Sequence, residues 1–191
     1  MLAAGYLLKR TAPPSGWLDH GTRHIRDVAS VADCVNDNVV DVQAAWQHNS
    51  FGLANTPETL EASVADRGLD AEGAVLFYYT AYEYELVSDG WTFDASAWRA
   101  RTPARSASVA DAVEPPSEGE TTLLGFDVVV FEDHLDHSPL SCNSVASELA
   151  VNEHCLIGDL DGAVRAIDTG AFGGGCEPGV YTVFAVYRVD R

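Results

Sequence analysis

Apolar residues recur at steps of three and four between residues 30 and 48, and they share one face over 159–170, which is the spacing of an amphipathic helix. Capping residues indicate two further helical segments, at 56–68 and 141–149. A Ser, Thr or Asp begins each segment, and a glycine ends two of them. These are the usual residues at helix N-caps and C-caps, so four helices are predicted.

Strands are indicated where apolar and polar residues alternate, or where β-branched and aromatic residues form short runs. They are expected at residues 5–11, 74–87, 91–95, 123–131 and 180–189. The Ser-Asp-Gly turn after the second of these segments predicts a β-hairpin with the third. The fourth segment is apolar enough to be a central strand.

The order of the elements, β-α-α-β-β-β-α-α-β, predicts an α+β fold. We expect one domain over residues 1–191, with a mostly antiparallel sheet of about five strands and helices packed on one face. Residues 99–120 are small, polar and proline-containing, which indicates a flexible surface loop or insertion within that domain. No internal repeat is evident.

The chain is strongly acidic. Its 191 residues include 29 Asp and Glu against 11 Lys and Arg, which gives a formal net charge of −18. Such a charge disfavours nucleic acid and anionic membranes as partners, because binding to them relies on clustered Lys and Arg. A basic partner protein is favoured, although the amino-acid usage of a GC-rich or salt-adapted host would also explain the charge.

The N-terminal segment does not have the order of a secretory signal, because Lys9 and Arg10 follow its short apolar run. No apolar stretch approaches the roughly 20 residues that span a bilayer. A cytoplasmic protein is therefore expected, in which the four scattered cysteines remain reduced.

Cys142 is a candidate nucleophile, because it is expected near the start of a helix, where the helix dipole stabilises a thiolate. His154 would serve as its base, and Asn143 or Asn152 would orient the imidazole or donate to an oxyanion. The alternative is that Cys142 and Cys155 are small buried apolar residues and that Asn143 and Asn152 cap or turn the backbone.

A metal site is a further candidate, in the polar stretch that follows strand 123–131. His134 and His137 lie three residues apart, and with Cys155 they would supply ligands for a tetrahedral zinc ion. Cys142 or Cys176 would complete the shell. The sequence contains no Cys-x-x-Cys pair, and solvated histidines are the alternative.

Two segments have the composition of a protein-binding surface. Tyrosine and glutamate alternate near the end of strand 74–87, and large aromatic rings beside carboxylates suit contact with a basic protein. The alternative is an ordinary strand with one buried and one wet side. The candidate contact residues are Tyr82, Glu83, Tyr84, Glu85, Asp133 and Asp136.

The leading hypothesis is a small acidic binding protein, of the immunity or antitoxin type, that inhibits a basic partner protein. It rests on the charge and on the lack of a recognisable catalytic set. The alternative is an enzyme with the Cys142–His154 site, or a metal site near residues 134–155.

Overall fold

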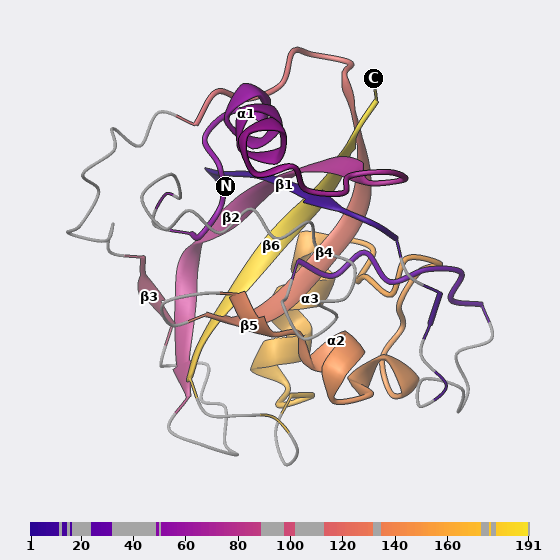
Figure 1. Ribbon diagram of the computed structural model, residues 1–191. Helices are drawn as coiled ribbons and strands as arrows, with labels where there is room; N and C mark the ends of the chain where they lie inside the picture. Colours follow the sequence, from indigo (N-terminus) through magenta and orange to yellow (C-terminus); the bar gives the residue numbers. More distant parts are fainter. Residues whose placement is uncertain are drawn as a thin grey trace.

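The computed structural model describes residues 1–11, 13–14, 16, 24–31, 49, 51–88, 98–101, 113–131, 135–172, 176 and 179–190. These residues build a six-stranded antiparallel sheet with a few helices (Figure 1). The elements are β1 (Leu2–Lys9), α1 (Pro57–Arg67), β2 (Val75–Ser88), β3 (Trp98–Ala100), β4 (Thr121–Phe131), β5 (Leu135–His137), α2 (Pro139–Cys142), the short 3-10 helix η4 (Val145–Ser147), α3 (Leu160–Asp168) and β6 (Gly179–Val189). The predicted α+β fold is confirmed.

The strand order is β1-β2-β6-β4-β5, and β3 pairs with the far end of β2. The run 123–131 forms β4, which has a neighbour on each side as predicted, although β6 occupies the centre. The predicted hairpin partner of β2 at 91–95 lies outside the described residues. Strand β3 follows a few residues later and pairs with β2 through Tyr84 to Leu86.

Two predicted helices are present with the predicted caps. The hydroxyl of Thr56 accepts from the backbone N–H of Thr59 at the start of α1, and the carboxylate of Asp159 accepts from that of Gly162 at the start of α3. The segment 141–149 is not one helix. It forms α2 and η4 instead, because Ser144 between them takes a left-handed φ of 61°. The helix predicted at 30–48 lies almost wholly outside the described residues.

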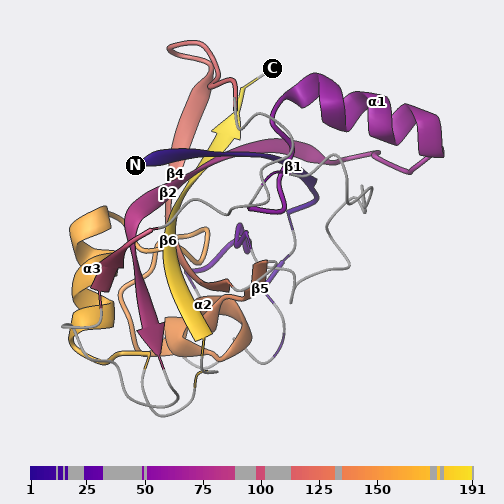
Figure 2. The same cartoon turned by 90° about the vertical axis from the view of Figure 1, so that its left-hand side faces the viewer.

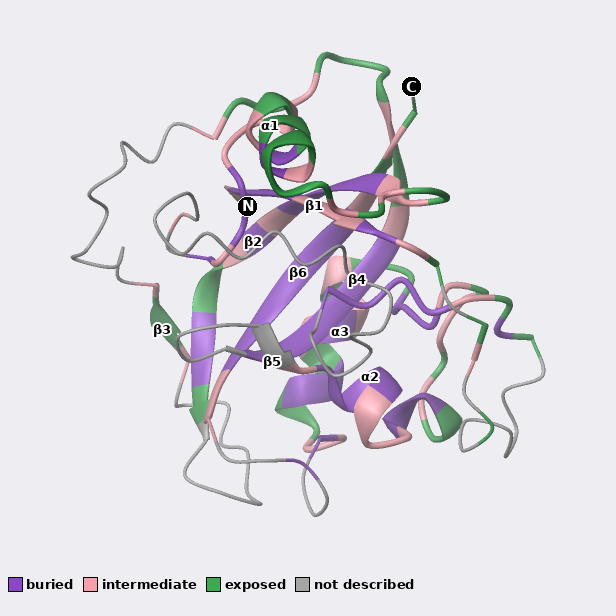
Figure 3. Ribbon diagram, viewed as in Figure 1, coloured by how far each residue is buried: buried purple, intermediate pink, exposed green. Residues whose placement is uncertain are grey.

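Helices α1 and α3 pack against side chains from the same alternate positions of β6, and therefore on the same face of the twisted sheet. They lie at opposite ends of the molecule (Figures 1 and 2). Leu60 of α1 packs with Tyr78 of β2, while Ala163 and Ile167 of α3 pack in the cluster that contains Val183 of β6. The opposite face carries a second core covered by loops. Figure 3 shows how much of β2, β4 and β6 is buried, while α1 keeps an exposed side. None of the described helices is long and apolar enough to cross a bilayer.

The fold contains an internal repeat that the sequence did not reveal. The first half consists of β1, α1 and β2, and the second half consists of β4, α3 and β6. In each half the two strands pair antiparallel, and a tight loop just before the helix bridges to the first strand of that half, β1 or β4. The halves meet along β2 and β6 about Tyr79 and Val186, which face each other in the register. The expectation of no repeat is therefore wrong.

In the first half the loop is organised by Asn49. Its Nδ2 donates to the carbonyl of Ala4 at 2.8 Å, and its Oδ1 accepts from the backbone N–H groups of Phe51 and Leu53. Gly5 lies beneath the loop with φ 129°, and a Cβ there would approach the carbonyl oxygen of Ala54 to 2.6 Å. The loop thus requires glycine in the strand that it crosses.

In the second half the same loop is organised by Asn152. Its Nδ2 donates to the carbonyl of Leu124 at 2.6 Å, and its Oδ1 accepts from the backbone N–H groups of His154 and Leu156. Gly125 has φ 149°, and a Cβ there would lie 2.7 Å from the Cβ of Leu156. Residue for residue, positions 49 and 51–56 correspond to positions 152 and 154–159.

Candidate functional site

The structure removes Cys142 as a nucleophile. Cys142 ends the four-residue helix α2 and is disulfide-bonded, so it offers no thiolate. Asn143 follows as the C-cap of α2, with its backbone N–H donating to the carbonyl of Pro139. The cysteine-nucleophile prediction fails, because the sulfur atom that it requires is already bonded. The expectation that every cysteine is reduced fails with it.

His154 has a structural partner. Its Nδ1 lies 2.7 Å from Oδ1 of Asp27, and its side chain is 14% exposed. The neighbouring backbone also joins the two segments, since Ala29 donates its N–H to the carbonyl of His154. His154 therefore ties the segment 24–31 to the second-half loop, and its imidazole is paired with a carboxylate rather than with Cys142.

The proposed metal ligands do not form a site in the part of the chain that the structure describes. His134 lies outside it, and no group of three or more His, Cys, Asp or Glu in it could hold a metal ion. Cys155 is buried as a free thiol, and burial together with the nearby charge of Asp127 raises its pKa to about 12. His137 ends β5 half-buried, with its Nδ1 unpartnered among the described residues.

The Tyr/Glu segment of β2 is divided between exposed and interior positions. Tyr84 is 44% exposed, and Glu83 bonds to the N-terminal amine of Met1 at 2.9 Å. Tyr82 is half-buried beside Tyr84 and stands edge-on to Trp98. Of this alternating segment, Glu83 and Tyr84 are exposed to solvent, whereas Tyr82 is half-buried.

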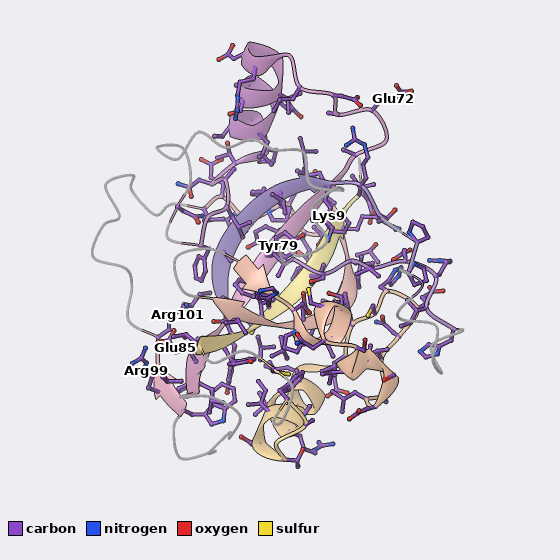
Figure 4. All side chains as sticks on the ribbon, turned by 60° about the horizontal axis from the view of Figure 1, so that its bottom comes forward. Lys9, Glu72, Tyr79, Glu85, Arg99 and Arg101 are labelled. Carbon is purple, nitrogen blue, oxygen red and sulfur yellow. The ribbon has the colours of Figure 1, made fainter. Side chains whose placement is uncertain are left out.

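Glu85 is not available to a partner. It is 7% exposed, and its carboxylate binds Arg99 at 2.8 Å and Arg101 at 3.3 Å (Figure 4). Arg101 also bonds to the hydroxyl of Thr182 and lies over the ring of Phe51. The arginines at the start of the expected loop 99–120 thus belong to a strand and an interior ion-pair cluster. Residues 102–112 lie outside the described part, as does Asp133, and the side chain of Asp136 is not described.

A buried polar network, which sequence reasoning missed, lies on the loop-covered face of the sheet. The carboxylate of Asp127 accepts from the hydroxyls of Ser30 at 2.7 Å and Ser138 at 2.5 Å, and from the backbone N–H of Val31 at 3.0 Å. The fully buried Lys9 donates its Nζ to the carbonyl of Ser30. The network joins β1, β4, the segment 24–31 and the start of α2.

The electrostatics of this network follow from its burial. Desolvation raises the pKa of Asp127, while the hydrogen bonds from Ser138 and Ser30 and the charge of Lys9 oppose that rise. Tyr79 lies in the same interior, and burial and the charge of Asp127 raise its pKa (Figure 4). The phenol oxygen of Tyr79 has no hydrogen-bond partner among the described residues. These groups are enclosed, so they hold segments together rather than meet a substrate.

An exposed acidic surface surrounds α1. Exposed carboxylates lie on α1, on the turn after it and on the segment 113–120, all at the same end of the molecule (Figures 1 and 2). Arg10 at this end pairs with Asp70 at 3.1 Å. The exposed acidic residues here that pair with no described basic residue are Glu58, Asp66, Glu72, Glu114, Glu118 and Glu120.

No protein-family model matches the chain, and neither the curated proteins nor the solved structures contain a match.

Proposed function

We propose that the protein is a small acidic binding protein that inhibits a basic partner protein, in the manner of an immunity protein or antitoxin. The exposed, unneutralised carboxylates around α1 carry the proposal. They concentrate part of the net charge of −18 at one end of the molecule. A surface of one sign speeds encounter with a partner of the opposite sign and excludes partners of the same sign.

The chemistry of the remaining candidates supports binding rather than catalysis. Cys142 is bonded as a disulfide, His154 is paired with Asp27, and the carboxylate of Asp127 is enclosed by its hydrogen-bond donors. The exposed Tyr84 beside Glu83 offers a second contact of the aromatic kind that anchors protein interfaces.

A matched pair of variants tests the proposal. Glu58→Gln/Asp66→Asn removes two charges from α1, and Glu148→Gln/Asp161→Asn removes two exposed charges near α3. Glu58 and Asp161 each lie in the first turn of a helix, so the pair is balanced for helix stability. Each protein is used to capture partners from its native host at about 50 mM and about 500 mM salt, which differ strongly in screening.

We expect the wild type and the α3 variant to retain the same basic protein at low salt and to release it at high salt. The α1 variant should retain several-fold less. Recovery of no basic protein at low salt would overturn the proposal, and equal recovery by both variants would overturn the assignment of the surface to α1.

The proposal includes a cytoplasmic location, against which the disulfide of Cys142 counts, because disulfides are rare in reducing compartments. Fractionation of the native host tests this part separately. Recovery outside the cytoplasm would overturn the location and leave the binding proposal standing.

A further inference from the structure

A pocket of about 570 Å³ lies beside α3 in the second half of the molecule. Leu149, Val151, Ile157 and Ala166 give it an apolar lining, and the exposed Arg165 stands on its wall. The guanidinium of Arg165 makes no ion pair with the described residues. Asp159 also lines the pocket, where its carboxylate caps α3 by accepting from the backbone N–H of Gly162. An apolar hollow of this size with two charged groups at its margin has the character of a ligand site.

In the first half, a segment of the chain itself occupies the corresponding region. Val113 packs against the core cluster that contains Ala54 and Leu60, and Glu114 donates its backbone N–H to the carbonyl of Asn55 at 3.2 Å. The hydroxyl of Tyr6 donates to the carbonyl of Glu114 at 2.5 Å. This two-residue stretch lies against the start of α1 in no regular secondary structure.

In the second half, the residues equivalent to those around Val113 and Glu114 line the pocket. Ala54 and Asn55 correspond to Ile157 and Gly158, which both line it. The carbonyl of Gly158, equivalent to the carbonyl that binds Glu114, accepts no hydrogen bond from the described residues. The second half therefore keeps the acceptor and the apolar wall, but no equivalent segment of the described chain bonds to them.

Sequence differences between the two helices enlarge this space and charge it. Thr59 and Leu60 of α1 correspond to Gly162 and Ala163 of α3, so two side chains are shorter in the second half. Arg165 corresponds to Ala62. The shorter side chains thus give the pocket room, and Arg165 gives it a positive charge. The first half has neither, and the protein as a whole has a net charge of −18.

We infer that the pocket beside α3 binds an extended segment of a partner polypeptide in which an aliphatic residue is followed by an acidic one. The aliphatic side chain enters the apolar hollow, a backbone N–H donates to the carbonyl of Gly158, and the carboxylate pairs with Arg165. The partner segment therefore binds in the same way as Val113 and Glu114 bind against α1, with an additional ion pair to Arg165. It is independent of the acidic surface around α1, which recognises the opposite charge.

The probe is a fluorescent peptide with the sequence of residues 112–116, Ala-Val-Glu-Pro-Pro, titrated with the full chain and followed by anisotropy. We expect a dissociation constant on the order of 0.1–1 mM, since so short a peptide buries little surface and loses much freedom. The same peptide with Gln in place of Glu should bind at least about fivefold more weakly, because it lacks the charge that meets Arg165.

Arg165→Glu should weaken binding at least about tenfold, and Arg165→Lys should weaken it less. Arg67→Glu is the matched control, since Arg67 is also an exposed helical arginine without a described ion pair, and it should leave binding unchanged. Circular dichroism verifies that each variant is folded.

Equal affinity for the wild type and Arg165→Glu would place the peptide at α1 and overturn the inference, as would no binding at about 5 mM peptide. Neither result bears on Glu58→Gln/Asp66→Asn, so the two proposals fail separately.

Discussion

The two halves of the molecule share a backbone and differ in what they bury. Each has a first strand (β1 or β4) with a constrained glycine, an asparagine that closes the loop, and a capped helix. The first half fills the positions around this frame with Leu7 and Phe51, where the second half has Asp127 and His154.

This difference determines how the rest of the chain is held. Phe51 packs edge-on against Phe184 within the core, whereas His154 and Asp127 bond to the segment 24–31. The backbone of the repeat thus accommodates either apolar or polar side chains at these positions. In each half the asparagine bonds to the loop backbone and the glycine leaves room for the loop, so the loop does not depend on those side chains. The second half has become the attachment point for additional chain.

The largest effect is expected from Asp127→Leu, which gives the second half the residue of the first. It removes the negative charge that Asp127 places near the buried Lys9 and the acceptor to which the hydroxyls of Ser30 and Ser138 donate, so it should reduce the free energy of unfolding by about 3–5 kcal/mol. Adding Lys9→Met should restore part of the loss. Urea unfolding measures both. No recovery in the double variant would show that the two charges do not act together.

The contribution of Asp127 to the free energy of unfolding should also depend on pH, in a direction that follows from its burial. Burial raises the folded-state pKa of Asp127 above its ordinary value of 3.8, so the folded state holds this proton more tightly than the unfolded state. The contribution of Asp127 is therefore most favourable in acid and declines as pH rises from about 3.8 towards the folded-state pKa. Subtracting the unfolding curves of Asp127→Asn from those of the wild type isolates it. A difference that rises with pH would contradict the assignment.

Gly5→Ala and Gly125→Ala test whether the two loops are equivalent. Each added Cβ meets loop atoms within 2.8 Å at a φ that disfavours side chains, so each should cost about 2–4 kcal/mol. Gly158→Ala is the control, because a Cβ there meets nothing within 4 Å, and its effect should stay within about 0.5 kcal/mol. Unequal losses at Gly5 and Gly125 would show that one loop can move aside and the other cannot.

Asn49→Ala and Asn152→Ala remove the side chains that close the loops. Asn49→Ala loses two donated and two accepted hydrogen bonds, and Asn152→Ala loses one donated and two accepted. We expect about 1–3 kcal/mol for each in chemical unfolding. Asn152→Asp keeps the acceptor and loses the donor, so it should lie between Asn152→Ala and the wild type. A larger loss for Asn152→Asp than for Asn152→Ala would mean that the two accepted hydrogen bonds do not offset the loss of the amide donor.

The smallest effect is expected from His154→Phe, which introduces the residue of the first half. The bond to Asp27 is partly exposed, so its loss should cost about 0.5–1 kcal/mol. A double-mutant cycle with Asp27→Ala measures the coupling directly. A coupling near zero would mean that the backbone bonds of residues 26–29 hold the segment without the side chains.

Much of the secondary structure could be predicted because its causes are local. The caps Thr56 and Asp159 and the glycine after α1 act within one helical turn, and the apolar runs of β4 and β6 indicate buried strands by themselves. The segment 141–149 was mispredicted because its interruption depends on one left-handed residue, Ser144, which no apolar pattern reveals.

The candidate site was predicted less well, because it depends on what lies opposite each side chain. Glu85 has the alternation of an exposed strand residue, yet arginines from the following strand enclose it. Cys142 has the position of a nucleophile, but a disulfide occupies it. Tyr84 and Glu83 kept their expected accessibility because β1 pairs with β2 only as far as Ala81.

By itself the sequence determined the charge, the α+β class and most helices and strands, since composition and periodicity are properties of the chain alone. Only the tertiary structure decided that the chain is built as two related halves. The repeat rests on two glycines and two asparagines separated by 44 positions in one half and 27 in the other. So few shared residues at unequal spacing leave no periodic signal. What makes them equivalent is the approach of a loop to a distant strand, which exists only once the sheet has formed.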